Sequence, residues 1–149
     1  MRLFATGATI AAVIGSLLTG PLGHATENQK IHRLAVHVDA NDPAIMNLAL
    51  NNAENAMEYY QAKGEEVQVE IVAYGPGLHM LRADTSPVKD RISRMKQQNV
   101  AFSACDNTRA AMEKREGKPV EIVPQATVVP SGVVRLMDLE EQGWSYVRP

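Results

Sequence analysis

Along the chain, segments with the apolar pattern of β-strands alternate with segments in which apolar residues recur at helical spacing. Runs with the composition of strands predict strands over 31–38, 67–73, 100–104, 120–123 and 144–147. Apolar residues at helical spacing predict helices between them, over 44–62, 78–83, 86–98, 108–115 and 133–142. The β-branched segment 127–129 lies so close to Pro130 that we expect a loop or a strand stub there.

This order predicts an α/β fold: a small single-domain parallel sheet of about five strands with helices on both faces, in a flavodoxin-like layering. In such sheets the carboxyl ends of the strands meet at one edge, and binding sites form there. We therefore expect the loops 39–42, 74–79 and 105–108 to gather at that edge.

Cys105 is the only cysteine, and it stands where an apolar strand gives way to a helical pattern. Backbone N–H groups at a helix start favour a thiolate, and Asn107 and Thr108 supply further donors. The adjacent Asp106 opposes a thiolate if its carboxylate points inward, and does so less if it caps the helix. The alternative is that Cys105 is an inert, buried apolar residue.

His37 and His79 fall near the ends of neighbouring strands, and a Cys–His pair could serve nucleophilic catalysis. Of the two, His79 is favoured by its place in a loop. Gly75 and Gly77 flank Pro76 in a turn that does not match a dinucleotide-binding motif, although it could line a pocket beside Cys105. One Cys with scattered His residues lacks the spacing of a metal site, so we expect neither a metal nor a cofactor.

The first 25 residues have the pattern of a signal peptide: Arg2, an apolar stretch, and small residues that predict cleavage after Ala25. The domain then spans 26–149, and we expect an exported, periplasmic protein with no membrane attachment after cleavage. The formal net charge of −2 and the absence of a basic run argue against nucleic acid as a partner.

Four segments together carry a resemblance to a known family: 102–108 around the cysteine, 72–78 with its G-P-G turn, 130–136, and 141–149 with the terminal G-W-S-Y. They resemble the DsrE family, and more narrowly its exported DsrE/DsrF-like members that carry a signal peptide. Asp106 follows the cysteine where similar proteins often have Gly.

The resemblance implies a small parallel α/β domain that assembles as a homo-oligomer, a trimer or a hexamer. It also implies that Cys105 carries sulfur as a persulfide and exchanges it with sulfur donor and acceptor proteins or small thiols. Because thiol exchange needs one Cys and no complete triad, a sulfur carrier or a redox sensor is favoured over a true catalyst.

Two alternatives belong to other classes. The first is a non-catalytic oligomeric module that binds a small ligand near Gly75, Gly77, Asn107 and Thr108, with Cys105 buried and inert. The second is a cysteine-dependent hydrolase, which requires His79 or His37 within hydrogen-bond reach of the sulfur.

Overall fold

Five parallel strands form the centre of the computed structural model, which describes residues 30–149. The strand order across the sheet is β4-β3-β2-β1-β5, and neighbouring strands pair in parallel. This sheet with its helices confirms the predicted α/β class. The strands are β1 (Ile31–Val38), β2 (Glu66–Ala73), β3 (Ala101–Cys105), β4 (Thr127–Val129) and β5 (Ser145–Val147).

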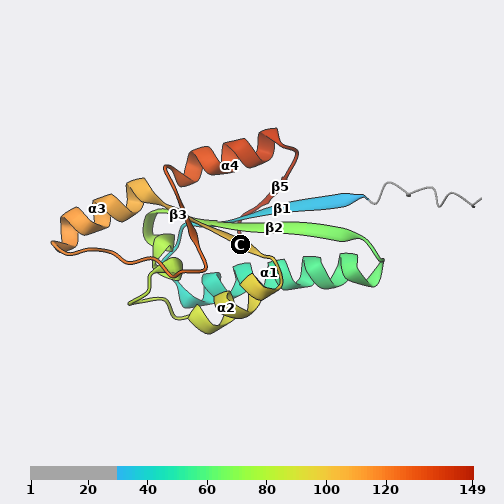
Figure 1. Ribbon diagram of the computed structural model, residues 1–149, viewed down its shortest axis with the longest axis horizontal. Coiled ribbons are helices and arrows are strands. Elements are labelled where there is room, and N and C mark those ends of the chain that lie inside the picture. The colour runs from blue at the N-terminus through green and yellow to red at the C-terminus, as the bar shows by residue number, and fades with distance from the viewer. Residues whose placement is uncertain (1–29) are drawn as a thin grey trace, which may run out of the picture.

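The helices divide unequally between the two faces of the sheet (Figure 1). They are α1 (Pro43–Ala62), the 3-10 helix η1 (Gly75–Leu81), α2 (Lys89–Gln97), α3 (Asp106–Glu116) and α4 (Gly132–Glu141). Helices α1 and α2 cover one face, and α4 lies alone on the other. Because the connection from β4 to β5 runs back across the sheet, a right-handed crossover places α4 on the opposite face.

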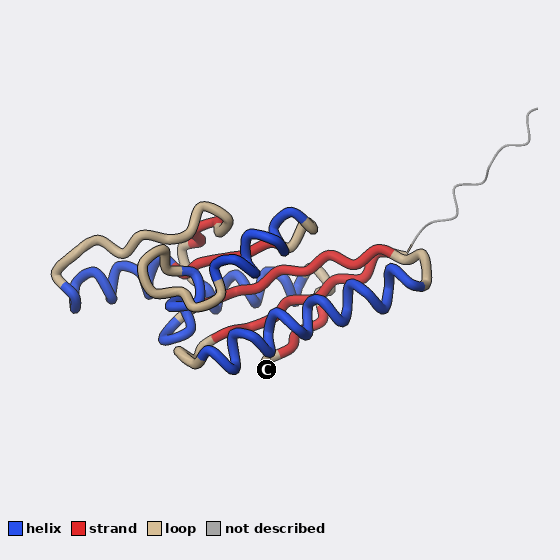
Figure 2. Tube along the Cα trace, turned by 90° about the horizontal axis from the view of Figure 1, so that it is seen from below, coloured by secondary structure: helices blue, strands red, loops and turns tan. Residues whose placement is uncertain are grey.

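The longest helix, α1, runs along the sheet beside β1 and β2 (Figure 2). Asp42 caps its first turn, because one side-chain oxygen accepts a hydrogen bond from Ala44 N at 2.7 Å, and Pro43 takes the first helical position. Its buried residues recur at helical spacing and so form one stripe along the helix: Met46, Ala49, Leu50 and Ala53.

The two faces bury cores of very different size. On the α1 side, Ile71 and Phe102 belong to a large apolar cluster with Leu50 and Met95. On the α4 side, the buried cluster consists of four residues: Ala35, Val72, Leu136 and Leu139. The sheet is therefore anchored mainly through the face that α1 and α2 cover.

The prediction of a strand over 120–123 is wrong, and β4 is instead Thr127–Val129. Val120 and Val123 are buried in the large cluster, which explains their strand-like composition. Their segment pairs with the loop after η1 rather than with the sheet: Val123 N donates to Leu81 O at 2.9 Å, and Ala83 N donates to Glu121 O at 2.8 Å.

Three of the five expected apolar positions of α4 do not face the sheet. Val133, Val134 and Met137 are each at least half exposed, whereas Leu136 and Leu139 are buried. Helix α4 therefore packs on the sheet through a narrow stripe that contains Leu136 and Leu139.

The predicted signal peptide and its cleavage after Ala25 lie outside the described residues. Within 30–149, no helix combines the length and the apolar character needed to cross a bilayer.

Candidate functional site

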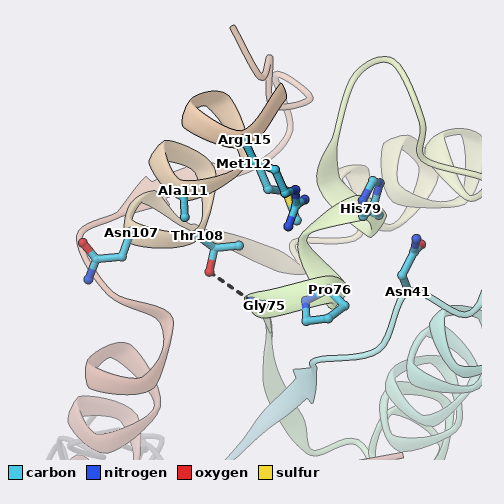
Figure 3. A pocket seen from close by; sticks show the side chains of 9 residues that line it. All are labelled: Asn41, Gly75, Pro76, His79, Asn107, Thr108, Ala111, Met112 and Arg115. Carbon is cyan, nitrogen blue, oxygen red and sulfur yellow. Dashed lines mark hydrogen bonds between the residues drawn. The ribbon is translucent and has the colours of Figure 1, made fainter. Parts of the chain in front are cut away.

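A pocket of about 410 Å³ lies at the carboxyl ends of the strands, where the three predicted loops meet (Figure 3). Loop 39–42 contributes Asn41, and η1 contributes Gly75, Pro76 and His79. The first turns of α3 close the other side through Asn107, Thr108, Ala111, Met112 and Arg115. The structure therefore brings four of the predicted site residues, Gly75, His79, Asn107 and Thr108, to one pocket.

Thr108 connects this pocket to the cysteine. Its hydroxyl oxygen accepts a hydrogen bond from Gly75 N at 3.0 Å and so ties α3 to the start of η1. Its backbone N–H donates to Cys105 Sγ at 3.4 Å. The sulfur therefore occupies the N-cap position of α3, where unpaired N–H groups favour negative charge.

The two glycines of the turn serve the backbone. Gly75 has a φ of 54°, a left-handed conformation that favours glycine. A Cβ on Gly77 would overlap the carbonyl of Val38, so the end of β1 and η1 can approach closely only with glycine there. Gly77 is buried and is not part of the pocket wall.

Cys105 is only 4% exposed and does not line the pocket. Pairing partners in a parallel sheet share a face, and His37, Val72 and Ser103 are aligned across β1, β2 and β3. Val72 packs against α4, so this row faces α4. Cys105 lies two residues beyond Ser103 on the same strand and points to the same face, away from α1 and α2.

The carboxylate of Asp106 is engaged by Arg109, one turn along α3. Arg109 Nε donates to Asp106 Oδ1 at 2.8 Å, and Arg109 Nη2 lies 2.6 Å from the same oxygen. Cys105, not Asp106, is the N-cap of the helix. Because Arg109 offsets the charge of Asp106, the acidic neighbour opposes a thiolate less than an unpaired carboxylate does.

His79 and His37 lie on different sides of the sheet edge. His79 lines the pocket, where its Nδ1 is 2.9 Å from Thr85 Oγ1. Burial and the nearby Arg82 guanidinium lower the pKa of His79. His37 is buried on the α4 face, with Nδ1 2.8 Å from Tyr146 Oη and its ring stacked on Tyr74 at 4.4 Å.

Within residues 30–149, Cys105 Sγ has its hydrogen bond with Thr108 N, and neither imidazole is bonded to the sulfur. The geometry thus lacks the Cys–His contact that the hydrolase hypothesis requires. No three His, Cys, Asp or Glu side chains in this part of the chain come together as a metal site.

Sequence reasoning missed a polar network beneath α4. Glu70, 3% exposed, accepts hydrogen bonds from Ser103 Oγ at 2.6 Å and from Arg135 Nε and Nη2 at 2.7 and 2.6 Å. The signal that could have found it is the position of Glu70 in a central strand, where a buried carboxylate requires a partner.

It also missed Tyr74, which packs against the α4 cluster and stacks on His37. Burial raises the pKa of Tyr74, and Tyr146, Asp39 and Cys105 add to the shift through their charges. A Cβ on Gly132 would lie 2.7 Å from Tyr74 Cδ1, so the glycine allows α4 to begin directly against this ring.

Comparison with known proteins gives a family and several solved structures that resemble this chain. The DsrE/DsrF-like family matches residues 32–149. A protein of unknown function from Methanobacterium thermoautotrophicum is 34% identical, with a TM-score of 0.68 over 79% of this chain and 99% of the other. Curated proteins show no significant match.

Proposed function

Because the chain belongs to the DsrE/DsrF-like family, which is associated with sulfur relay, we propose that Cys105 carries sulfane sulfur as a persulfide. The observation that carries the proposal is the placement of Sγ as the N-cap of α3, with Thr108 N–H directed at it. An N–H group there stabilises the thiolate before transfer and the anionic persulfide after it.

The transfer is an exchange at sulfur with no net oxidation. The Cys105 thiolate attacks the outer sulfur of a donor persulfide, the new S–S bond forms at Sγ, and the donor's S–S bond breaks. The donor thiolate leaves with the bonding electron pair. An acceptor thiolate then attacks the outer sulfur in the same way and restores Cys105, so the protein acts as a carrier.

Mass spectrometry after treatment with a donor persulfide tests the proposal. We expect a gain of one sulfur atom on the peptide that contains Cys105, reversed by a thiol reductant. Cys105→Ser abolishes the gain, whereas Thr108→Val retains it because the backbone N–H remains. If no sulfur appears on Cys105, the persulfide role fails, and reversible oxidation of the same thiol then tests the redox-sensing form of the hypothesis.

The alternative small-ligand module is favoured by two observations, the low exposure of Cys105 and the separate pocket of about 410 Å³. In that case the pocket binds the ligand and the sulfur is inert. Iodoacetamide under native conditions distinguishes the two: fast labelling of Cys105 supports the carrier and slow labelling supports the module.

We propose further that the protein is exported and assembles as a homo-oligomer. Exposed apolar side chains on α1 and β5 support assembly: Leu48, Tyr59 and Val147. Sedimentation analysis should show an oligomer for the natural chain and a smaller species for Leu48→Glu. Sequencing the N-terminus of protein recovered from the periplasm tests both export and cleavage after Ala25.

A further inference from the structure

A second cavity, of about 330 Å³, lies between β4 and α4 on the face of the sheet to which Cys105 points. Its wall consists of Val129, Pro130, Ser131, Val134, Arg135 and Asp138. Val129 is the pairing partner of Cys105 across β3 and β4 and shares its face. This cavity, unlike the pocket beside η1, therefore lies on the same side of the sheet as the thiol.

The segment between β4 and α4 lines the cavity and passes close to Cys105. It starts beside Cys105 at Val129, and Pro130 O accepts a hydrogen bond from Asn107 N at 3.3 Å. It ends at Gly132, which lies against Tyr74 at the end of β2. Because β3 lies between β4 and β2, the segment crosses the end of β3 and covers Cys105.

Few apolar contacts hold this cover in place. Leu136 and Leu139 are the buried large apolar residues of α4, and the helix is also held by the Arg135–Glu70 ion pair and by Gly132 against Tyr74. Displacing the start of α4 therefore disrupts much less packing than moving α1 or α2 would. The cavity beside the cover is where an incoming group can reach the sulfur with the least rearrangement.

The two cavities also differ in charge. In the cavity beside α4, the Arg135 guanidinium is already paired with Glu70, so the exposed Asp138 leaves an excess of negative charge. The pocket beside η1 has Arg115 and His79 in its wall and no carboxylate. The α4 cavity thus disfavours anions. In the other pocket Arg115 lies 3.8 Å from Glu116 and the pKa of His79 is lowered by burial, so its wall carries no comparable excess of either charge.

We propose that the sulfur-exchange partner reaches Cys105 through the cavity between β4 and α4, and that this partner is an uncharged or cationic thiol in an apolar setting. The inference rests on the proposed function, because it names the route and the substrate class for the same thiol. Small anionic sulfur compounds are then poor substrates.

Three methanethiosulfonate reagents, which share one reactive group and differ in charge, test the route. They are the neutral methyl, the cationic aminoethyl and the anionic sulfonatoethyl compound. In each reaction the Cys105 thiolate attacks the thio sulfur, a disulfide forms at Sγ, the reagent's S–S bond breaks, and methanesulfinate leaves with the electron pair. The rate of disulfide formation is followed by mass spectrometry on the folded protein.

Two tryptophan variants at exposed positions block one cavity each. Val134→Trp fills the α4 cavity and should slow labelling by the neutral reagent about tenfold or more, which corresponds to about 1.4 kcal/mol in the barrier. Ala111→Trp fills the pocket beside η1 and should leave the rate within about twofold. If Ala111→Trp slows labelling and Val134→Trp does not, the proposed route is wrong.

Reagent charge tests the partner class. We expect the neutral and cationic reagents to react faster than the anionic one, and Asp138→Lys should reverse the order of the two charged reagents. An anionic reagent that is fastest in the natural protein overturns the class. If Val134→Trp fails to fold, Val134→Phe and Asp138→Lys provide the same comparison.

Labelling rates report access to the sulfur and are independent of persulfide formation. A protein that forms the persulfide while Val134→Trp and Ala111→Trp label equally fast would contradict the route alone.

Discussion

The two faces of the sheet differ in what they bury and in what they can do. The α1 side buries an apolar cluster that includes Ile71, Phe102 and Leu50. The α4 side has four buried apolar residues and, beside them, the buried polar side chains of His37, Glu70 and Ser103. The thiol of Cys105 points to this second side. One face therefore buries most of the apolar core, whereas the other carries the thiol, the buried imidazole of His37 and the Glu70–Arg135 ion pair.

Topology explains the difference. Within residues 30–149, α4 is the only helix on its face, and a single helix cannot cover five strands. The cavity lies between β4 and α4, and the rest of the α4 interface consists of two leucines, one ion pair and the partly buried rings of Tyr74 and Trp144. A thinly packed face permits local opening at little cost.

Matched Leu→Ala substitutions on the two faces give the largest expected effects. Leu50 and Leu139 are both fully buried. Leu50→Ala should lower the free energy of unfolding by about 3–5 kcal/mol, because the large cluster cannot collapse onto the cavity it leaves. Leu139→Ala should cost about 2–3 kcal/mol, because the thin layer under α4 relaxes more readily.

Urea unfolding followed by far-ultraviolet circular dichroism measures both values. The fluorescence of Trp144, the only tryptophan and a neighbour of the α4 cluster, reports on that face separately. Equal losses for the two variants would contradict the claim that the faces differ in how firmly they are packed.

Arg135→Met should have the next largest effect, a loss of about 2 kcal/mol. The substitution leaves the Glu70 carboxylate buried with Ser103 Oγ as its remaining hydrogen-bond donor among those observed. The expected loss is moderate because Arg135 is 31% exposed, so water can reach the vacated position.

Lys118→Met is the matched control, since Lys118 makes a 3.5 Å contact with Asp84 and is mostly exposed. It should change the free energy of unfolding by less than about 0.5 kcal/mol. Urea titration measures both, and a double variant with Glu70→Gln should recover part of the Arg135→Met loss. No recovery would mean that the ion pair does not account for the stability of α4.

The element order could be predicted from the sequence because local signals and burial agree along most of the chain. Asp42 and Pro43 fix the start of α1, and the alternation that ends in an apolar run identifies β2. The edge strand β4 could be predicted only as one of two alternatives, a loop or a strand stub. It has three residues next to Pro130, whereas Val120 and Val123 have strand composition but fill the core beneath a loop.

The site was predictable only in part, for a similar reason. Strand ends place Gly75, Asn107 and Thr108 round one pocket, since chain order and parallel pairing determine that edge. The face to which Cys105 points depends on one residue of register, and a strand buried on both sides shows no polar alternation that reveals it. The partner of Glu70 lies 65 residues away and has no local signal.

His37 gives the smallest expected effect and the sharpest contrast between the faces, since the α1 side buries no such imidazole among the described residues. The imidazole of His37 lies beside Tyr74 and Tyr146. Burial lowers its pKa below the ordinary value of about 6.5, Asp39 opposes this shift, and Arg148 lowers the pKa further. The unfolded chain therefore takes up a proton more readily than the folded one. The contribution of His37 to stability is therefore complete above the pKa of the unfolded chain and is lost as pH drops from there toward the pKa of the folded protein.

The urea midpoint should decline between about pH 7.5 and about pH 5.5, and His37→Asn should flatten the decline while keeping a polar group near Tyr146. His79→Asn is the control: burial lowers its pKa too, but His79 is only half-buried whereas His37 is buried, so the substitution should remove less of the slope. A slope that His37→Asn leaves intact would show that the α4 face does not set the response to acid.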